Sequence, residues 1–522
     1  MSSQHPVPTP APTPSSAASV PPRAGAREWA ALVVLMLPVL LVSVDNTVLS
    51  FALPAIATDL RPSSTAQLWI VDVYALVLAG LLVAMGSLGD RFGRRRLLLV
   101  GSTGFAAVSV VAAFAPDAGT LIATRAALGF FGAMIMPATL SLLRSTFQDR
   151  SQRRLAIAVW ASGFSAGSAL GPIVGGVLLE HFPWGSVFLL AVPMLVPLLV
   201  AAPLLLRESR DPHPGPADPL SVLLSLLAMG PVVGAVKLFA SGEGVVLPLV
   251  LVVVGVASGW AFVRRQLRRE RPLLDVRLFT NAVFSGSVVV NLLAVVALVG
   301  FLFFTTQHLQ LVVGLRPLDA AFVLVPGLVA TVLAGLLVVP VVRRLRPRTV
   351  VATGLTASAL GYAFVAVSGA DAPVGVFVAA FALVGAGVGA AETISNDLII
   401  AAVPPARAGA ASAVSETAYE VGALLGTAVL GSIVTAVYRA SLVLPEGVPG
   451  AGAEAARDTL GGAVSVAGQL EGPVAERLLE AATSAFDAGL VWTAGTGAGL
   501  VLVAVVVALT ALRRASSADQ HA

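Results

Sequence analysis

The chain of 522 residues contains no cysteine, one lysine (Lys237) and five histidines. Without cysteine it forms no disulfide and offers no thiolate nucleophile or thiolate metal site. The histidines are scattered, without the close spacing that zinc ligands need: they are His5, His181, His213, His308 and His521. The residue types therefore exclude a disulfide framework, and we expect no metal site.

Motifs of several enzyme classes are also missing. The sequence has no H-E-x-x-H zinc motif, no G-x-S-x-G nucleophile turn and no G-x-x-x-x-G-K-[ST] phosphate loop. The first two absences argue against a membrane-embedded hydrolase, and the third argues against an ATP-driven pump. We expect no enzymatic activity and no cofactor.

Charged residues are scarce, at 11% of the chain, whereas hydrophobic residues reach 57%. A soluble protein carries about 25% charged residues, so a water-soluble core does not account for this composition. A helix needs about 20 mostly apolar residues to cross a bilayer. We count fourteen such segments, near residues 30–54, 68–88, 97–115, 119–143, 153–180, 185–206, 218–239, 246–264, 281–307, 316–341, 348–369, 373–401, 408–440 and 487–512. The sequence therefore predicts an all-α integral membrane protein.

Arginine-rich segments fall between alternate spans, as at 89–96, 144–154, 264–277 and 343–348. Cytoplasmic loops carry an excess of Arg and Lys, so we expect both chain ends to be cytoplasmic. For the same reason we interpret the net charge of +4 as a topology signal, and we expect no nucleic-acid partner.

The chain ends and one long loop have their own composition. Residues 1–27 are rich in Pro, Ala and Ser, which predicts a disordered cytoplasmic tail, and 513–522 form a second tail. Residues 441–486 make an acidic outer loop with apolar residues at helical spacing in "VAERLLEAATSAF". This loop is either a solvated linker or contains one or two short helices that lie over the outer mouth.

Two glycine patterns stand out. Gly163, Gly167, Gly171 and Gly175 are four residues apart, so on a helix they form one ridge against which a neighbouring helix packs closely. Pro172 lies in the same stretch and predicts a bend. A plain packing seam is the alternative to a functional role for this ridge.

The second pattern is the turn "GSLGDRFGRRRLLLVG" (86–101). Gly86 and Gly89 allow close backbone approach, Gly93 belongs to the same motif, and Asp90 is placed to meet a helix N-terminus or an arginine. Arg91 and Arg94 begin a cluster that holds the turn at the lipid headgroups. A simple topology signal would not need this particular order of residues.

Several of these segments resemble the major facilitator superfamily, in particular its fourteen-helix drug–proton antiporters. Residues 86–96 are similar to the signature loop between the second and third helices of that family. "GFSAGSALGPIVGG" is similar to its fifth-helix motif, and "LVSVDNTVLSFALPAI" (41–56) to its first-helix motif. "LIATRAALGFFGAMIMPATLSLL" (121–143) is similar to the fourth-helix motif and places Arg125 at its buried arginine. The matching segments span nearly the whole chain.

The resemblance implies a major facilitator fold. It predicts a six-helix bundle over 28–206, two inserted transmembrane helices with linkers over 207–277, and a second six-helix bundle over 278–512. It also implies alternating access in a monomer of the bacterial inner membrane. The implied activity is export of lipophilic cations, such as quaternary ammonium antiseptics, dyes and fluoroquinolones, driven by protons as coupling ion.

Acidic residues within the predicted spans are the main functional candidates. An ionised group at the bilayer centre costs about 3 kcal/mol or more, so such residues usually line a cavity and carry function. The six are Asp45, Asp72, Glu392, Asp397, Glu416 and Glu420. A buried carboxyl holds a proton until a cation displaces it, which would make protons and cationic substrates compete.

We assign different roles to these acids. Asp45, tuned by Arg125 as the resemblance implies, is predicted to couple protons, and Asp72 to receive protons near the outer end of its helix. Glu416 and Glu420 share one helical face and are predicted to bind cationic substrate, with Glu392 as a deeper acid. Asp72 as an interfacial residue and Glu416 with Glu420 as a structural pair remain alternatives.

Aromatic and amide side chains are expected to complete the binding site, because a cation over an aromatic face gains ~0.5–2 kcal/mol. The candidates are Trp69, Tyr74, Phe164, Phe303, Phe304, Gln307 and Tyr419. Two other transport functions remain open: export of a self-made antibiotic or metabolite, and proton-coupled uptake of a nutrient.

Overall fold

The computed structural model describes residues 23–210, 218–241, 244–270, 272, 274–342, 344–369, 372–403, 408–470 and 472–514. All regular secondary structure within these ranges is helical, which confirms the predicted class. The tails expected at 1–27 and 513–522 lie largely outside the described residues.

The first half of the chain forms six spans. The helices are α1 (Ala26–Leu60), α2 (Ser64–Phe92), α3 (Arg94–Ala113), α4 (Ala118–Thr146), α5 (Arg150–His181), and α6 (Ser186–Leu189), which is followed directly by α7 (Ala191–Leu205). α2 and α4 begin at the side-chain N-caps Ser63 and Asp117. These residues satisfy backbone N–H groups that the first helical turn leaves free.

The rest of the chain contains a helical hairpin and six further spans. The hairpin consists of α8 (Pro219–Ser241) and α9 (Val246–Arg268), and the short η1 (Val276–Thr280) follows it. Then come α10 (Ala282–Gln307) with the π-helix η2 (His308–Val312), α11 (Pro317–Val342), α12 (Pro347–Ser368), α13 (Val374–Ala401), α14 (Ala408–Leu425), the π-helix η4 (Gly426–Gly431), α15 (Ser432–Ser441), α16 (Gly450–Asp458), α17 (Leu460–Ala467), α18 (Pro473–Ala511) and η5 (Leu512–Arg514).

Thirteen helical stretches in the described part of the chain are long and apolar enough to cross a membrane. α5 is a further long helix that is not among these thirteen. Its apolar stretch within the described residues is Leu170–His181. The span predicted at 408–440 is continuous through α14, η4 and α15. The prediction of about fourteen spans is therefore confirmed.

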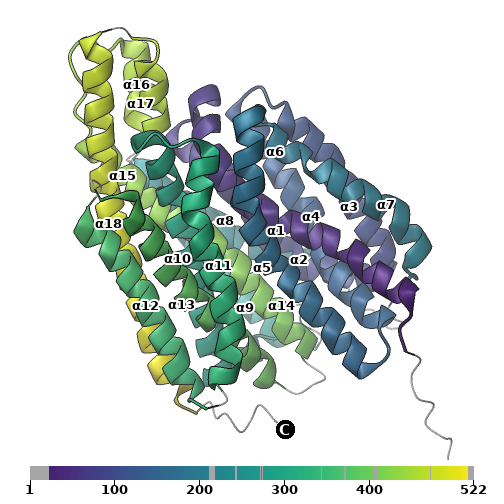
Figure 1. Ribbon diagram of the computed structural model, residues 1–522. Coiled ribbons are helices and arrows are strands. Elements are labelled where there is room, and N and C mark those ends of the chain that lie inside the picture. The colour runs from purple at the N-terminus through teal and green to yellow at the C-terminus, as the bar shows by residue number, and fades with distance from the viewer. Residues whose placement is uncertain are drawn as a thin grey trace, which may run out of the picture.

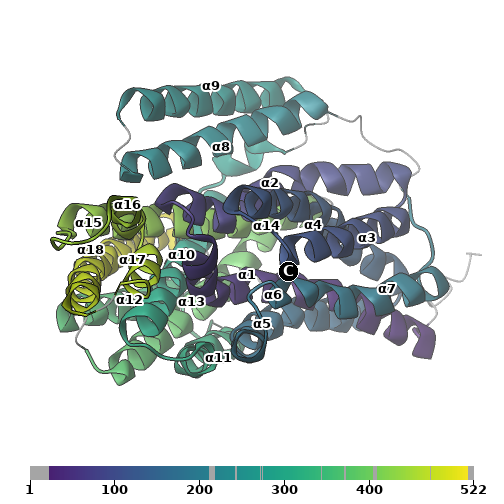
Figure 2. The same cartoon turned by 90° about the horizontal axis from the view of Figure 1, so that it is seen from above.

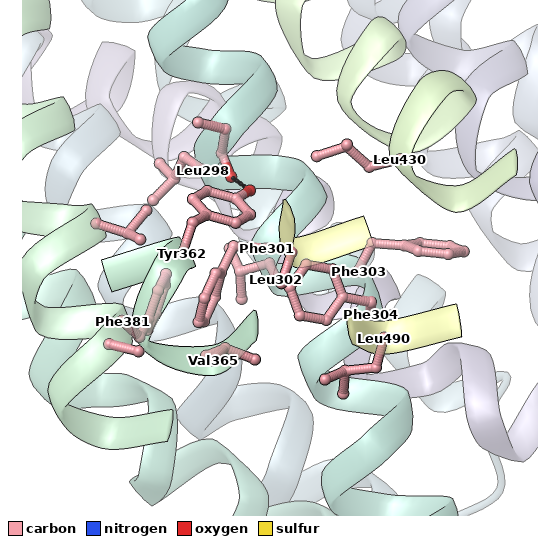
Figure 3. Packing of buried hydrophobic residues seen from close by; sticks show 14 of the residues in the cluster. Leu298, Phe301, Leu302, Phe303, Phe304, Tyr362, Val365, Phe381, Leu430 and Leu490 are labelled. Atoms are coloured by element: carbon pink, nitrogen blue, oxygen red, sulfur yellow. Dashed lines mark hydrogen bonds between the residues drawn. The ribbon is translucent and has the colours of Figure 1, made fainter. Parts of the chain in front are cut away.

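Two large buried clusters underlie the two sets of spans. One is built from residues between Ala31 and Leu206, and the other mainly from residues between Val290 and Leu512. In the second, the rings of Phe301 and Phe381 stack with centroids 5.3 Å apart, and Tyr362 meets Phe301 edge-on (Figure 3). We call the α1–α7 set the N bundle and the α10–α15 set with α18 the C bundle (Figure 1).

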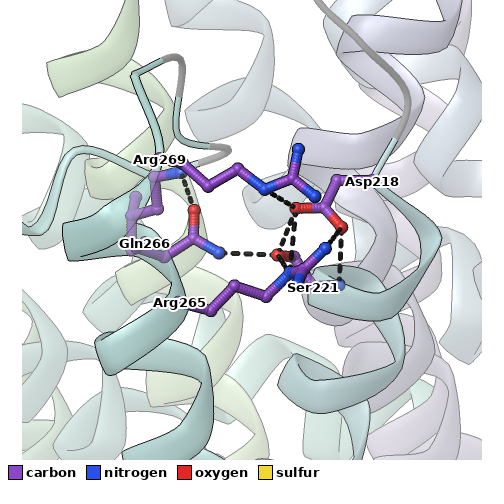
Figure 4. A network of polar contacts seen from close by, with 6 residues as sticks. Asp218, Ser221, Arg265, Gln266 and Arg269 are labelled. Carbon is purple, nitrogen blue, oxygen red and sulfur yellow. Dashed lines mark hydrogen bonds and ion pairs between the residues drawn. The ribbon is translucent and has the colours of Figure 1, made fainter.

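The hairpin α8–α9 lies beside both bundles, with α8 facing α2 and α9 outermost (Figure 2). An ion-pair network closes one end of the hairpin (Figure 4). There the Asp218 carboxylate lies 2.9 Å from Arg265 Nη2 and 3.3 Å from Arg269 Nε. Burial alone would raise the pKa of Asp218, but bonds from Arg265 and Ser221 outweigh it and lower the pKa to about 2. The network therefore stays charged at any physiological pH.

The predicted glycine ridge on α5 packs against one face of α1. An added Cβ at Gly167 would lie 3.0 Å from the Leu40 carbonyl oxygen, and one at Gly175 would lie 2.6 Å from Val48 Cγ2. Gly163 and Gly171 meet α1 in the same way, and Pro172 is buried in the same stretch. The absence of side chains on this ridge therefore sets the spacing between α1 and α5.

The short helices α16 and α17 stand at one end of the molecule, next to the start of α18 (Figure 1). They confirm the prediction of short helices in 441–486, but "VAERLLEAATSAF" forms the first turns of α18 instead. Tyr438 donates a hydrogen bond to the Ala456 carbonyl, and Gly461 of α17 packs against Ala57 of α1. We call this end the capped face and the opposite end, where α3 begins, the arginine face.

Three polar contacts between the two bundles lie at the capped face. Gln67 Nε2 donates to Gln307 Oε1 at 3.2 Å, and Arg316 Nη1 lies 2.6 Å from Glu180 Oε1. Gln310 donates to the carbonyl of Phe51. Because these contacts join α1, α2 and α5 to the C bundle, the capped face is closed in this structure.

We predict that Gly167→Val disrupts the seam between α1 and α5. The new side chain has no room beside Leu40 and Ser43, and overpacking of this kind costs about 1–3 kcal/mol. The melting temperature of the purified protein should fall. Gly499→Val on α18 is the matched control, because nothing lies within 4 Å of a Cβ added there. Equal melting temperatures for the two variants would contradict the role of the ridge.

Candidate functional site

A buried ion pair joins α1 to α4. Asp45 Oδ2 lies 2.7 Å from Arg125 Nη1, and the two residues are 8% and 1% exposed. Arg125 also donates from Nε to the Ile70 carbonyl at 3.2 Å. A guanidinium stays charged in any protein environment, so Arg125 provides a permanent positive charge beside Asp45.

Tyr74 of α2 completes this group. The Arg125 guanidinium carbon lies 4.4 Å from the centre of its ring, which is a cation–π contact. Close packing of α4 on α2 brings the groups together: a Cβ added at Gly129 would lie 2.5 Å from the Tyr74 carbonyl oxygen. Asp45 and Arg125 were predicted to act together, and the structure brings them into direct contact.

The C bundle contributes Glu416 and Glu420 from one face of α14. Glu420 is 4% exposed, whereas Glu416, one turn nearer the arginine face, is half-buried. One buried oxygen of each carboxyl has no hydrogen-bond partner within the described part of the chain. Tight packing of α14 on α10 holds them in place, since a Cβ added at Gly422 would lie 2.8 Å from the Leu292 carbonyl oxygen.

Acids of the two bundles lie within electrostatic range of one another across the interface between the bundles. Glu420 interacts electrostatically with both Glu416 and Asp45. Tyr419 interacts with Glu420 and also with the half-buried Glu392 of α13. These contacts link four of the predicted acids into one group, which we call the acidic cluster: Asp45, Glu392, Glu416 and Glu420.

Three polar residues next to the acidic cluster were not predicted from the sequence. Asn291 of α10 donates to Ser415 Oγ at 3.3 Å, and Ser415 also bonds Asn396 of α13. Asn291 is 1% exposed. The available signal was a polar amide inside an apolar span, which is the same signal that identified the acids. The network ties α10, α13 and α14 together beside Glu416.

Other predicted site residues lie elsewhere. Gln307 and Phe303 line a small cavity of about 20 Å³ at the capped face, between α2 and α10. Phe304 is packed in the aromatic core of the C bundle (Figure 3), and Asp397 lies exposed near the arginine face. The side chain of Phe164 is outside those described.

Asp72 also lies outside the acidic cluster. It forms an ion pair with Lys237 of the inserted hairpin, 2.9 Å from Oδ2 to Nζ, and both side chains are fully buried. Trp69, predicted as a site aromatic, stacks on the same lysine, with 4.0 Å between Nζ and the ring centre. The sequence alone did not pair these residues.

The turn at 86–96 is built around a carboxylate that sequence reasoning missed. Asp90 meets Arg94 at 2.8 Å, as predicted. Glu208, which follows α7, accepts from the backbone N–H of Arg95 at 3.0 Å and so caps α3. Gly93 has φ +115°, and a Cβ there would lie 2.7 Å from the Glu208 carboxyl. Both its conformation and its surroundings therefore require glycine, while Arg91 points outward over Phe92.

The acidic cluster has the chemistry of a site for cations and protons. It combines four carboxyl groups with one permanent cation, Arg125. The described residues contain no group of three or more His, Cys, Asp or Glu residues arranged to hold a metal ion. Unpartnered carboxyl oxygens in a weakly polar environment gain a partner only by taking up a proton or by binding a donor or a cation.

Comparison with known proteins places this geometry in a family. Residues 35–427 match the model of the Major Facilitator Superfamily. The chain is 55% identical to the multidrug efflux pump LfrA of Mycolicibacterium smegmatis, over 94% of this chain and 98% of that protein. It is 36% identical to the methyl viologen resistance protein SmvA of Salmonella typhimurium, over 92% and 97% of the two chains.

A solved structure shares the fold. It is the inward-facing, occupied form of a bacterial homolog to the human lysosomal transporter Spinster, with a TM-score of 0.64 over 95% of this chain and 99% of that chain. At 17% identity, this likeness shows the fold alone. The family model and the two relatives carry the assignment: the chain is a multi-pass membrane transporter, not an enzyme, and belongs to the Major Facilitator Superfamily.

Proposed function

We propose that this protein exports lipophilic cationic compounds in exchange for protons. The observation that carries the proposal is the acidic cluster, in which Asp45 of the N bundle and Glu420 of the C bundle interact across the bundle interface. The relatives support export, because one is named a multidrug efflux pump and another a methyl viologen resistance protein.

The charges of the cluster favour a cationic substrate. Asp45 has Arg125 as its partner, so Glu416 and Glu420 remain as acids without a neighbouring cation among the described residues. Tyr419 lies beside them and adds an aromatic face, on which a cation gains ~0.5–2 kcal/mol. Glu392 extends the acidic region along α13.

The graded exposure of the acids indicates their access route. Glu416 is half-buried and Glu420 is almost fully buried, so the opening lies toward the arginine face. The positive-inside rule makes that face cytoplasmic. With the capped face closed, a cation enters from the cytoplasm, reaches Glu416 first and then approaches Glu420 and Asp45.

Exchange follows from competition for the same negative charge. A bound cation favours the ionised carboxyl groups and therefore lowers their affinity for protons, and by linkage a bound proton lowers the affinity for the cation. When the capped face opens, protons from outside replace the cation. A membrane potential that is negative inside favours proton entry by about 2.3 kcal/mol per charge per 100 mV.

The cellular setting is part of the proposal. Both chain ends lie in the cytoplasm, and the protein resides in the bacterial inner membrane. A monomer is the working unit, because one chain supplies both sides of the acidic cluster. No cofactor is needed, since protons are the coupling ion.

The first prediction concerns the energy source. Cells that express the protein should pump out a cationic dye, and a protonophore should stop this efflux, because the gradient that replaces bound cation by protons is gone. Efflux is followed by dye fluorescence. Unchanged efflux after the protonophore would rule out proton exchange, and absence of any efflux of dyes, quaternary ammonium compounds or quinolones would rule out drug export.

The second prediction concerns Asp45. Asp45→Asn should reduce dye efflux by more than about tenfold at unchanged amounts in the membrane, because it removes a carboxyl of the acidic cluster and leaves the Arg125 charge without its partner. Asp319→Asn is the matched control, since Asp319 is 43% exposed at its side chain on the capped face. Normal efflux by Asp45→Asn would remove this residue from the coupling mechanism.

The third prediction separates binding from structure. Glu416→Gln should weaken the export of cationic compounds about tenfold, the equivalent of about 1.4 kcal/mol, and affect neutral compounds much less. Glu454→Gln, on the exposed surface of α16, should change neither. Equal losses for cationic and neutral compounds would instead assign Glu416 a structural role.

A further inference from the structure

The only lysine of the chain is buried inside the membrane-spanning region. Lys237 is 1% exposed on α8, and its ammonium contacts Asp72 Oδ2 at 2.9 Å and the Trp69 ring at 4.0 Å. A cluster of apolar side chains surrounds the pair: Ala75, Leu76, Val233, Leu424 and Ala428, with Trp69 and Met229 packed against them. Both side chains of the pair are fully buried, so the pair is shielded from water.

Three parts of the protein meet at this ion pair. Asp72 belongs to α2 of the N bundle and Lys237 to the inserted hairpin. Thr427, which lies beside the Asp72 carboxyl, belongs to η4 of the C bundle. η4 is a π-helical segment within a long span, and such segments are frequent at functional sites. Any rocking of the two bundles must change at least one of these three contacts.

The contacts of α8 indicate which partner it keeps. Ser225 donates to the Gly80 carbonyl at 3.3 Å, and a Cβ added at Gly80 would overlap Leu226. Together with Lys237 and Asp72, these contacts hold α8 to α2 at two levels of the membrane. α8 also packs against α15 and η4 of the C bundle, whereas the polar contacts of Ser225 and Lys237 are with α2.

The ammonium of Lys237 occupies the kind of place that a cationic substrate would take. It has a carboxylate on one side and an indole face on the other, which are the groups that recognise organic cations. Because this cation is covalently part of the chain, the charge of Asp72 is already balanced. Asp45 is also paired, with Arg125, but it interacts in addition with Glu420 of the acidic cluster. Asp72 interacts with Lys237 and Thr427 instead, so we infer that it does not exchange a proton for substrate.

We propose that Lys237 is a positioning residue that acts as a built-in counter-ion for Asp72 and fixes the inserted hairpin to the N bundle. The hairpin then moves with α2 during transport, and the contact with Thr427 is the one that changes. This inference builds on the proposed exchange of cations for protons, and it removes Asp72 from the set of exchanging acids.

A double-mutant cycle tests the pair. Asp72→Asn and Lys237→Met each leave one buried group without its partner, so each should lower the rate of dye efflux about tenfold at equal amounts in the membrane. The double variant Asp72→Asn/Lys237→Met should recover to within about threefold of the parent and stay sensitive to protonophore. Lys237→Arg, which keeps the charge, should also retain transport.

Two outcomes of the cycle would overturn the inference. A double variant as inactive as Asp72→Asn would make Asp72 an obligatory proton carrier. Full efflux by Lys237→Met would show that transport does not depend on the pair. In either case the protonophore result for the parent protein still decides the proposed function separately.

An engineered disulfide provides a second test, whose first readout is the yield of cross-link and not transport. The chain lacks cysteine, so the two cysteines of the variant Gly80→Cys/Leu226→Cys have no other thiol in the chain to pair with. A Cβ at position 80 lies 4.0 Å from the Leu226 Cα, within disulfide reach. Oxidation should cross-link α2 to α8 in high yield and leave efflux within about twofold of the reduced protein.

Adding Lys237→Met to the cysteine pair should lower the yield of cross-link severalfold, measured by thiol labelling and gel mobility. An unchanged yield would show that Lys237 does not hold the hairpin in place. If the disulfide stopped efflux and a reductant restored it, the hairpin would have to move relative to α2, and the inference would be wrong.

Discussion

A carboxylate within the hydrocarbon layer requires a cation or a proton, and this requirement shapes the interior of the protein. Asp45 has a permanent cation, Arg125, at 2.7 Å. Asp72 has a cation from a different part of the chain, Lys237. Glu416 and Glu420 have no cation in contact among the described residues, and we propose that a proton or substrate binds at their unpartnered oxygens. The acids therefore differ in whether a cation of the chain is their partner. We propose that this partner determines whether an acid is available to bind a proton or a substrate.

The two buried cations are chemically different. Arg125 makes a hydrogen bond to the α2 backbone and a cation–π contact besides its ion pair, so three interactions hold its planar group in place. Lys237 presents a compact ammonium to one carboxylate and one indole. Apart from histidine, all other basic side chains in the described spans are arginines, and most lie near helix ends. The one lysine thus marks the contact between the inserted hairpin and the N bundle.

Close backbone packing allows these side chains to meet. The glycine ridge of α5 brings α1 inward, and Gly129 and Gly422 do the same for α4 on α2 and for α14 on α10. Side chains at these positions would separate the helices that carry Asp45, Arg125 and Glu420. At the capped face, hydrogen bonds and α17 join the bundles, which supports the proposal that the acidic cluster is reached from the arginine face.

The sequence by itself determined the number of spans, their approximate limits and the arginine-rich side, and it singled out Asp45, Arg125, Glu416 and Glu420 as candidates. These follow from local physics, because apolar length and an acid within an apolar run can be read without knowing which helices are neighbours. The separation of Asp72 from the other acids, the capping of α3 by Glu208 and the Asn291 network were decided only by tertiary structure. Each depends on a partner more than a hundred residues away along the chain, and no local pattern specifies which distant helix supplies it.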